Sequence, residues 1–166
     1  MAWQLCPCDP EQTTRRNEII KIEQSVTIHR PVEEVFAFLA DIENWRRLQS
    51  VPGELEQASR GPMKVGDTFR QTLEISGQRI ELLCEVVELE EDKRLSFEYT
   101  WDQLFLWIGL VFEPLDGGTR LATGGEGRLG GFMALFEPLV ANEVDSQLTT
   151  KLDNLKDLLE SRATSK

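Results

Sequence analysis

The sequence predicts an α+β domain in which an antiparallel sheet packs against one long C-terminal helix. Short alternating segments separated by turn residues fill positions 55–128, and strands at such short spacing form antiparallel meanders rather than βαβ units. Pro31 begins a shorter helix that interrupts the strands early. Positions 132–161 keep apolar residues three or four apart, the spacing of one buried helix face: Val144, Leu148, Leu152, Leu155 and Leu159.

One strand and two short helices are expected at the start of this domain. Positions 19–29 alternate as a strand whose core-facing residues are Ile20, Ile22, Val26 and Ile28. Pro31 suits the first turn of a helix, because its missing N–H would have no partner there. One apolar helix face follows: Val32, Val35, Phe36 and Leu39. Asp41 then suits the N-cap of a second short helix at 42–48.

Six further strands are expected at 55–59, 69–75, 80–86, 95–101, 104–112 and 119–128. Gly77-Gln78 suits a hairpin turn, and Val86-Val87 breaks the alternation, which indicates a β-bulge. The segment 95–101 has the clearest alternation in the chain. Its core-facing residues are Leu95, Phe97, Tyr99 and Trp101.

The predicted C-terminal helix carries a proline and a charged face. Pro138 lies near its start, so the proline either kinks the helix or marks a separate first segment. The face opposite the leucines is charged and is expected to point to solvent. Its residues are Glu143, Lys151, Asp153, Lys156 and Asp157.

The charge balance bears on the classes of partner. The chain has 166 residues, with 18 basic against 29 acidic side chains and a net charge of -11. Such a surface repels phosphate backbones and anionic headgroups, which disfavours binding to nucleic acid or to a membrane surface. No apolar run reaches the roughly 18 residues of a spanning helix, so no membrane insertion is expected.

The N-terminal residues differ from the rest. Positions 1–18 have no strand or helix periodicity, so a flexible tail is expected before a single domain at 19–162. The tail lacks the basic and apolar regions of a signal peptide, which predicts a cytoplasmic protein with free thiols. Cys6 and Cys8 offer two thiolates where structural zinc usually needs four ligands, so no metal site is expected.

Several motifs in this order resemble the START-like helix-grip (SRPBCC) superfamily, and most closely its polyketide cyclase/dehydrase-like branch. The motifs are VTIHRPVEEVFAFLADIENWRRL at 26–48, GPMKVGDTF at 61–69, EVVELEEDKRLSFEYTW at 85–101 and LDNLKDLLE at 152–160. The resemblance implies a seven-stranded antiparallel sheet wrapped around the long C-terminal helix, with a cavity between them. It further implies that this cavity takes lipid-, polyketide- or quinone-like molecules. Family members of this kind either bind such molecules or cyclise and dehydrate them, and no universal catalytic motif identifies which.

The inward side chains are the candidates for binding a ligand, with core packing as the alternative for each. Ten are predicted: Phe69, Leu73, Leu82, Cys84, Phe97, Tyr99, Trp101, Leu110, Leu139 and Glu143. Tyr99, the only tyrosine, could donate its hydroxyl proton to a carbonyl group.

Three residues are candidates for catalysis, namely Tyr99, Glu126 and Glu143. A carboxylate in an apolar cavity can act as an acid or base because burial raises its pKa. The alternative is that both glutamates are surface charges. Cys84 lacks a neighbouring base, since the only histidine, His29, is expected on the outward side of its strand. No cofactor is expected, because nothing resembles a phosphate loop or a nucleotide fingerprint.

The segment 104–112 is apolar on both faces, unlike its neighbours. If Leu106 and Leu110 face inward, then Phe105, Trp107 and Val111 face outward, and such a row suggests an interface. The leading hypothesis is therefore the binding of a small hydrophobic or aromatic molecule in the cavity. The alternatives are a cyclase- or dehydratase-type enzyme and a homodimeric module that associates through Leu104–Phe112.

Overall fold

A computed structural model describes the chain except for residues 1–18, 46, 49–54, 58–61, 76 and 165–166. The predicted tail, with Cys6 and Cys8, lies outside the described residues. The elements are β1 (Ile19–Ile28), α1 (Val32–Leu39), α2 (Ile42–Trp45), β2 (Leu55–Gln57), β3 (Thr68–Ile75), β4 (Gln78–Glu90), β5 (Arg94–Trp101), β6 (Leu104–Leu115), β7 (Gly118–Leu129), the 3-10 helix η2 (Gly131–Phe136) and α3 (Glu137–Thr164). Their order confirms the predicted fold class.

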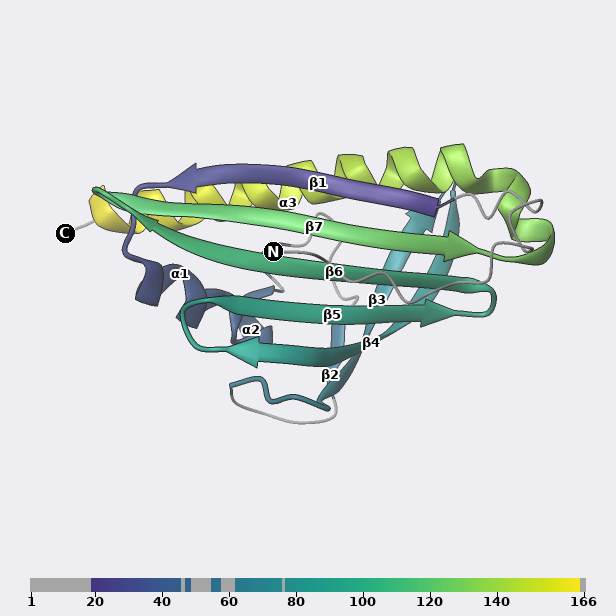
Figure 1. Ribbon diagram of the computed structural model, residues 1–166, viewed down its shortest axis with the longest axis horizontal. Coiled ribbons are helices and arrows are strands. Elements are labelled where there is room, and N and C mark those ends of the chain that lie inside the picture. Colours follow the sequence, from purple (N-terminus) through teal and green to yellow (C-terminus); the bar gives the residue numbers. More distant parts are fainter. Residues whose placement is uncertain (1–18, 46, 49–54, 58–61, 76, 165–166) are drawn as a thin grey trace, which may run out of the picture.

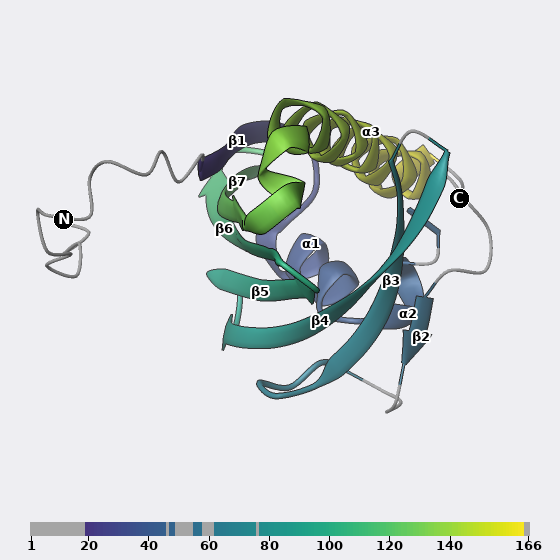
Figure 2. The same ribbon diagram turned by 90° about the vertical axis from the view of Figure 1, so that its right-hand side faces the viewer.

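In the described part of the chain, seven strands form one antiparallel sheet in the order β1-β7-β6-β5-β4-β3-β2. Consecutive strands from β2 to β7 are neighbours, as in a meander. The first strand, β1, pairs with β7 and forms one edge of the sheet. The predicted bulge lies in β4, where the register with β5 shifts between Val86 and Glu88. Figure 2 shows the sheet curving around α3 from β1 to β3, with α1 and α2 toward the far end.

The C-terminal segment is not one continuous helix. The 3-10 helix η2 occupies Gly131–Phe136, and α3 begins at Glu137. Pro138 therefore lies in the first turn of α3, where its missing N–H costs no helical hydrogen bond. Of the two alternatives for Pro138, a separate first segment is the correct one.

Hydrogen bonds tie α3 to the edge strand β1. Gln24 on β1 donates to Asp145 and accepts from Thr149, both on α3. Further along, Lys156 donates to the carbonyl of Thr27 and to Glu160, which also accepts from the backbone N–H of His29. The helix lies along β1 (Figure 1) and has a smaller contact with β3 on the other side.

The two short helices bring an aromatic side chain against the sheet. Asn44 and Trp45 of α2 donate side-chain hydrogen bonds to the carbonyls of Phe38 and Leu39 in α1, which holds the two helices together. Trp45 then contacts Phe97 on β5, with ring centroids 4.8 Å apart.

Candidate functional site: an apolar cavity under the C-terminal helix

A cavity of about 110 Å³ lies between the sheet, the short helices and α3. Most of its lining is aliphatic or aromatic, and the residues come from α1, α2, α3 and five strands. The lining residues are Leu39, Trp45, Leu48, Gln71, Leu82, Phe97, Tyr99, Leu106, Ile108, Leu110, Leu121, Val144, Gln147, Leu148, Lys151, Leu152 and Leu155. Such a site suits a small apolar body with few polar groups.

An aromatic cluster forms one wall of this cavity. The ring of Phe97 is edge-on to Trp45 and lies 6.1 Å from Phe69 and 6.3 Å from Tyr99 between centroids. Phe97 is only 1% exposed. Edge-to-face aromatic pairs add stabilisation beyond their area, so this wall is set by the fold before any ligand arrives.

Gln71 on β3 places an unsatisfied oxygen at the cavity. It is 6% exposed, and its Oε1 is buried without a hydrogen-bond partner in the described part of the chain. Thr123 Oγ1, on the inner face of β7, is a second such atom. A buried acceptor without a partner costs free energy, so Gln71 favours a ligand or water molecule that donates to it.

Lys151 is the cationic group among the cavity's lining residues. It forms no hydrogen bond or ion pair with the residues that the structure describes. Desolvation by burial lowers the pKa of its amine from 10.5 to about 8. Burial acts in this direction because an apolar environment disfavours the ammonium form.

Tyr99 and Cys84 lie opposite each other on the adjacent strands β5 and β4. Burial raises the pKa of both groups. Both groups therefore stay protonated near neutral pH, and the thiol is not an activated nucleophile.

The structure places the ten predicted ligand-binding residues in different positions. Four line the cavity: Leu82, Phe97, Tyr99 and Leu110. Three pack into the core beside it without reaching the lining: Phe69, Cys84 and Trp101. Leu139 is 45% exposed near the start of α3, so this part of the prediction is wrong, and the side chain of Leu73 lies outside the described residues. That the lining residues bind a ligand stays a prediction.

The carboxylates proposed as acid or base do not line the cavity. Glu126 is exposed on the outer face of β7, because it follows Gly125 and precedes Gly127 on the alternating inner face. Glu143, also predicted to bind ligand, accepts a 2.9 Å hydrogen bond from Gln147, which does line the cavity. The structure corrects both placements, and Glu143 can act on a ligand only through Gln147.

Sequence reasoning missed Lys151, Gln71 and Trp45. Lys151 was expected on the solvent face of α3, yet it lies seven residues after Val144 and three after Leu148, both in the lining. That spacing is the period of one helix face, so the sequence already indicated that Lys151 shares a face with Val144 and Leu148. The charge of lysine instead led to a prediction of solvent exposure. Gln71 likewise follows inward-facing Phe69 by two positions, the period of a strand.

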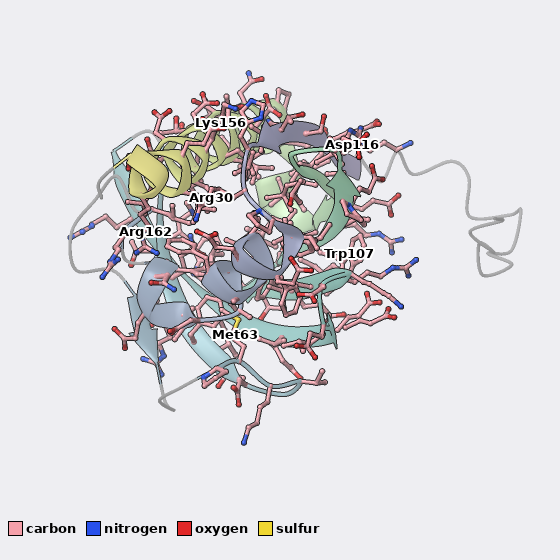
Figure 3. All side chains as sticks on the ribbon, turned by 90° about the vertical axis from the view of Figure 1, so that its left-hand side faces the viewer. Arg30, Met63, Trp107, Asp116, Lys156 and Arg162 are labelled. Carbon is pink, nitrogen blue, oxygen red and sulfur yellow. The ribbon has the colours of Figure 1, made fainter. Side chains whose placement is uncertain are left out.

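The outer face of β6 carries the apolar row that the alternation predicts. Phe105 and Val111 are each 39% exposed, and Trp107 is half-buried. The indole of Trp107 lies over Gly109, since a Cβ at that position would approach it to 2.7 Å. Figure 3 shows Trp107 apart from α3 and Lys156. Covering the glycine gives Trp107 a packing function within the chain.

Acidic side chains flank Trp107 across the sheet. Glu98 and Glu126 stand opposite it on the neighbouring strands, and Glu85 is opposite Glu98. Two copies meeting through this face would bring these carboxylates together, which opposes self-association. No cluster of metal-ligating side chains occurs in the described ranges, and no helix there is long and apolar enough to cross a membrane.

Comparisons with known proteins agree with this architecture. The solved structure of the Zhui aromatase/cyclase from Streptomyces sp. R1128 is similar, with a TM-score of 0.72, 13% identity, and coverage of 88% of this chain and 96% of that one. The protein TTHA0849 from Thermus thermophilus matches with a TM-score of 0.72, 21% identity, and coverage of 88% and 99%. The structure of Ara h 8.0201 matches with a TM-score of 0.68, 14% identity, and coverage of 86% of this chain and 99% of that one. At these identities the likeness shows the fold alone.

Sequence comparison bears on the family itself. No curated protein matches the chain. The family model described as "Polyketide cyclase / dehydrase and lipid transport" matches residues 20–160, from the first strand to the end of α3. The chain therefore belongs to the polyketide cyclase/dehydrase and lipid transport family.

Proposed function

We propose that this protein binds a small molecule with an apolar body in the cavity under α3. The observation that carries the proposal is the cavity itself, in which aliphatic and aromatic side chains surround a few polar groups. Close-packed proteins have few apolar hollows of this size, so a partly open one under the C-terminal helix favours a binding site. The family supports the same function.

The volume of the cavity narrows the size of the ligand. Drug-sized ligands usually occupy about 300–1,000 Å³, whereas this cavity holds about 110 Å³. An engineered apolar cavity of about 150 Å³ in another protein takes up benzene. The proposed ligand therefore has a body of about one aromatic ring or a short alkyl chain, which favours the quinone-like class over long lipids or multi-ring polyketides.

Filling the cavity is expected to abolish this binding. Leu148 lines the cavity from α3 and is half-buried, so Leu148→Trp should place an indole in the ligand's space. Titration calorimetry with ethylbenzene should show saturable one-to-one binding to the wild type and about tenfold or more weaker binding to the variant. Leu135→Trp, at an exposed position of η2, is the control and should bind as the wild type does. Equal binding by all three proteins would place the ligand elsewhere.

A cyclase-type enzyme is the second candidate function. The family and the aromatase/cyclase neighbour favour it, and two ionisable groups, Tyr99 and Lys151, line the cavity. Such an enzyme would depend on these two groups rather than on Glu126 or Glu143. Tyr99 would serve as a neutral hydrogen-bond donor, because burial keeps its pKa raised.

The homodimer through Leu104–Phe112 remains a separate prediction. If two copies associate through this face, Trp107→Glu should halve the mass in multi-angle light scattering without loss of the sheet signal in circular dichroism. Lys64→Glu, exposed before β3, is the control and should leave the mass unchanged. A wild type that is already monomeric would rule the homodimer out, as the acidic row around Trp107 leads one to expect.

A further inference from the structure

Two unsatisfied polar groups of opposite kind reach the same apolar cavity. Lys151 brings an amine from α3, and Gln71 brings a carbonyl oxygen from β3. In the described part of the chain the buried Oε1 of Gln71 has no hydrogen-bond partner. The amine of Lys151, on a half-buried side chain, has none there either. An ammonium only donates hydrogen bonds and an amide oxygen only accepts them. The first group therefore needs an acceptor atom of the ligand, and the second needs a donor.

The sheet positions of these groups show how such a ligand would lie. Gln71 is opposite Leu82, and Phe69, two residues earlier, is opposite Cys84. Gln71 and Cys84 are therefore diagonal neighbours on the inner face of adjacent strands, a position in which two residues are typically about 7–8 Å apart. Tyr99 stands beside Cys84 on the next strand. Polar atoms thus gather on the β3–β5 side of the cavity, opposite the helix that carries Lys151.

The charged and titratable groups near Lys151 leave its amine without a counter-ion. From the sheet, the titratable groups near it are Cys84 and Tyr99, which remain neutral because burial raises the pKa of both. From α3 itself the nearest carboxylate along the face is Glu143, which is engaged with Gln147. The short helices and the turn after α2 contribute Leu39, Trp45 and Leu48, which carry no charge. The Lys151 side chain is half-buried, so its ammonium is partly desolvated, and a bound anion would offset that cost.

Resting on the proposed function, we propose that the ligand carries a carboxylate-like anionic group on its apolar body and that the ammonium of Lys151 binds this group. A hydroxyl or amine of the ligand is then the complement of Gln71 Oε1. The ligand class is therefore a small aryl or alkyl acid rather than a neutral hydrocarbon. The net charge of -11 repels such an acid at long range, so recognition depends on contact inside the cavity, where screening is weak.

A matched pair of compounds tests this proposal. Para-ethylbenzoate and para-ethylbenzamide have the same shape and differ in charge. At about pH 6.5 the wild type should bind the acid about tenfold or more tightly than the amide, because a hydrogen bond to a charged group exceeds a neutral one. Lys151→Met should lose this preference, because its affinity for the acid should fall more than its affinity for the amide. Lys64→Met removes a lysine charge at an exposed position outside the cavity lining and should keep the preference.

Proton uptake provides an independent readout. At about pH 8, near the pKa of the free amine, binding of the acid should take up about half a proton, measured in buffers of different ionisation enthalpy. Binding of the amide should take up none. Equal affinity for acid and amide in the wild type would overturn the anionic-ligand proposal and leave the apolar cavity standing. Failure of ethylbenzene and of both compounds to bind would overturn the cavity function and this proposal together.

Discussion

Replacing Phe97 with alanine should lower the free energy of unfolding by about 3–5 kcal/mol, the usual cost of truncating a buried aromatic side chain. The Phe97 side chain is 1% exposed and contacts Trp45 of α2 at 4.8 Å between ring centroids. Its removal would enlarge the adjacent cavity and leave Trp45 without its closest aromatic neighbour. The loss would therefore loosen both the sheet and the short helices.

Chemical denaturation in urea measures this effect. Phe105→Ala is the matched control, since Phe105 lies on the outer face of β6 and is 39% exposed. Less apolar surface is buried there, so its truncation should cost clearly less than that of Phe97. A smaller loss for Phe97→Ala than for Phe105→Ala would contradict the placement of the aromatic cluster in the core.

The stability of the wild type should rise between pH 8 and 10 by up to about 2 kcal/mol relative to Lys151→Met. The pKa of Lys151 is lowered from 10.5 to about 8 in the folded protein because burial disfavours the ammonium form. Between these two pKa values the unfolded chain binds more protons than the folded one. Stability therefore increases with pH in this window, and the methionine variant lacks this contribution.

Thermal or urea unfolding at several pH values measures this difference. Comparing the two proteins cancels the titration of groups that they share, such as Cys84 and Tyr99. Lys64→Met, at an exposed position before β3, retains Lys151 and should show the same rise as the wild type. Parallel pH profiles for the wild type and Lys151→Met would mean that the amine is not desolvated in the folded protein.

Much of the fold could be predicted because the strands alternate clearly. In β5 the inward row of Leu95, Phe97 and Tyr99 is buried, as the period of two requires. The same alternation places Phe105 and Val111 on the outer face of β6, although the residues next to them in the sequence are all apolar. The early proline and the spacing of leucines in α3 indicated the helices for equally local reasons.

The polar part of the candidate site could not be read from the sequence in the same way. Lys151 shares a helix face with Val144 and Leu148, and yet a lysine at such a position normally extends to solvent. Here α3 is tied to β1 through Gln24 and Lys156, and the face of the helix that carries Lys151 lines the cavity. The position of α3 on the sheet thus depends on contacts between residues more than a hundred positions apart, which a local sequence pattern does not show.

The prediction that Glu126 and Glu143 lie in the cavity failed for a different reason. Neither carboxylate lines the cavity: the strand period turns Glu126 outward, and Glu143 is held by Gln147. Residue type alone had singled them out, whereas the strand parity of β7 already opposed an inward Glu126.

Locating a bound apolar molecule tests the central claim most directly. Crystals soaked in bromobenzene allow the bromine atom to be found by anomalous scattering. The cavity account predicts an anomalous peak between Phe97 on β5 and Leu148 on α3, and no such peak in Leu148→Trp crystals. A peak confined to the outer face near Trp107, or a cavity that remains empty at saturating bromobenzene, would contradict it.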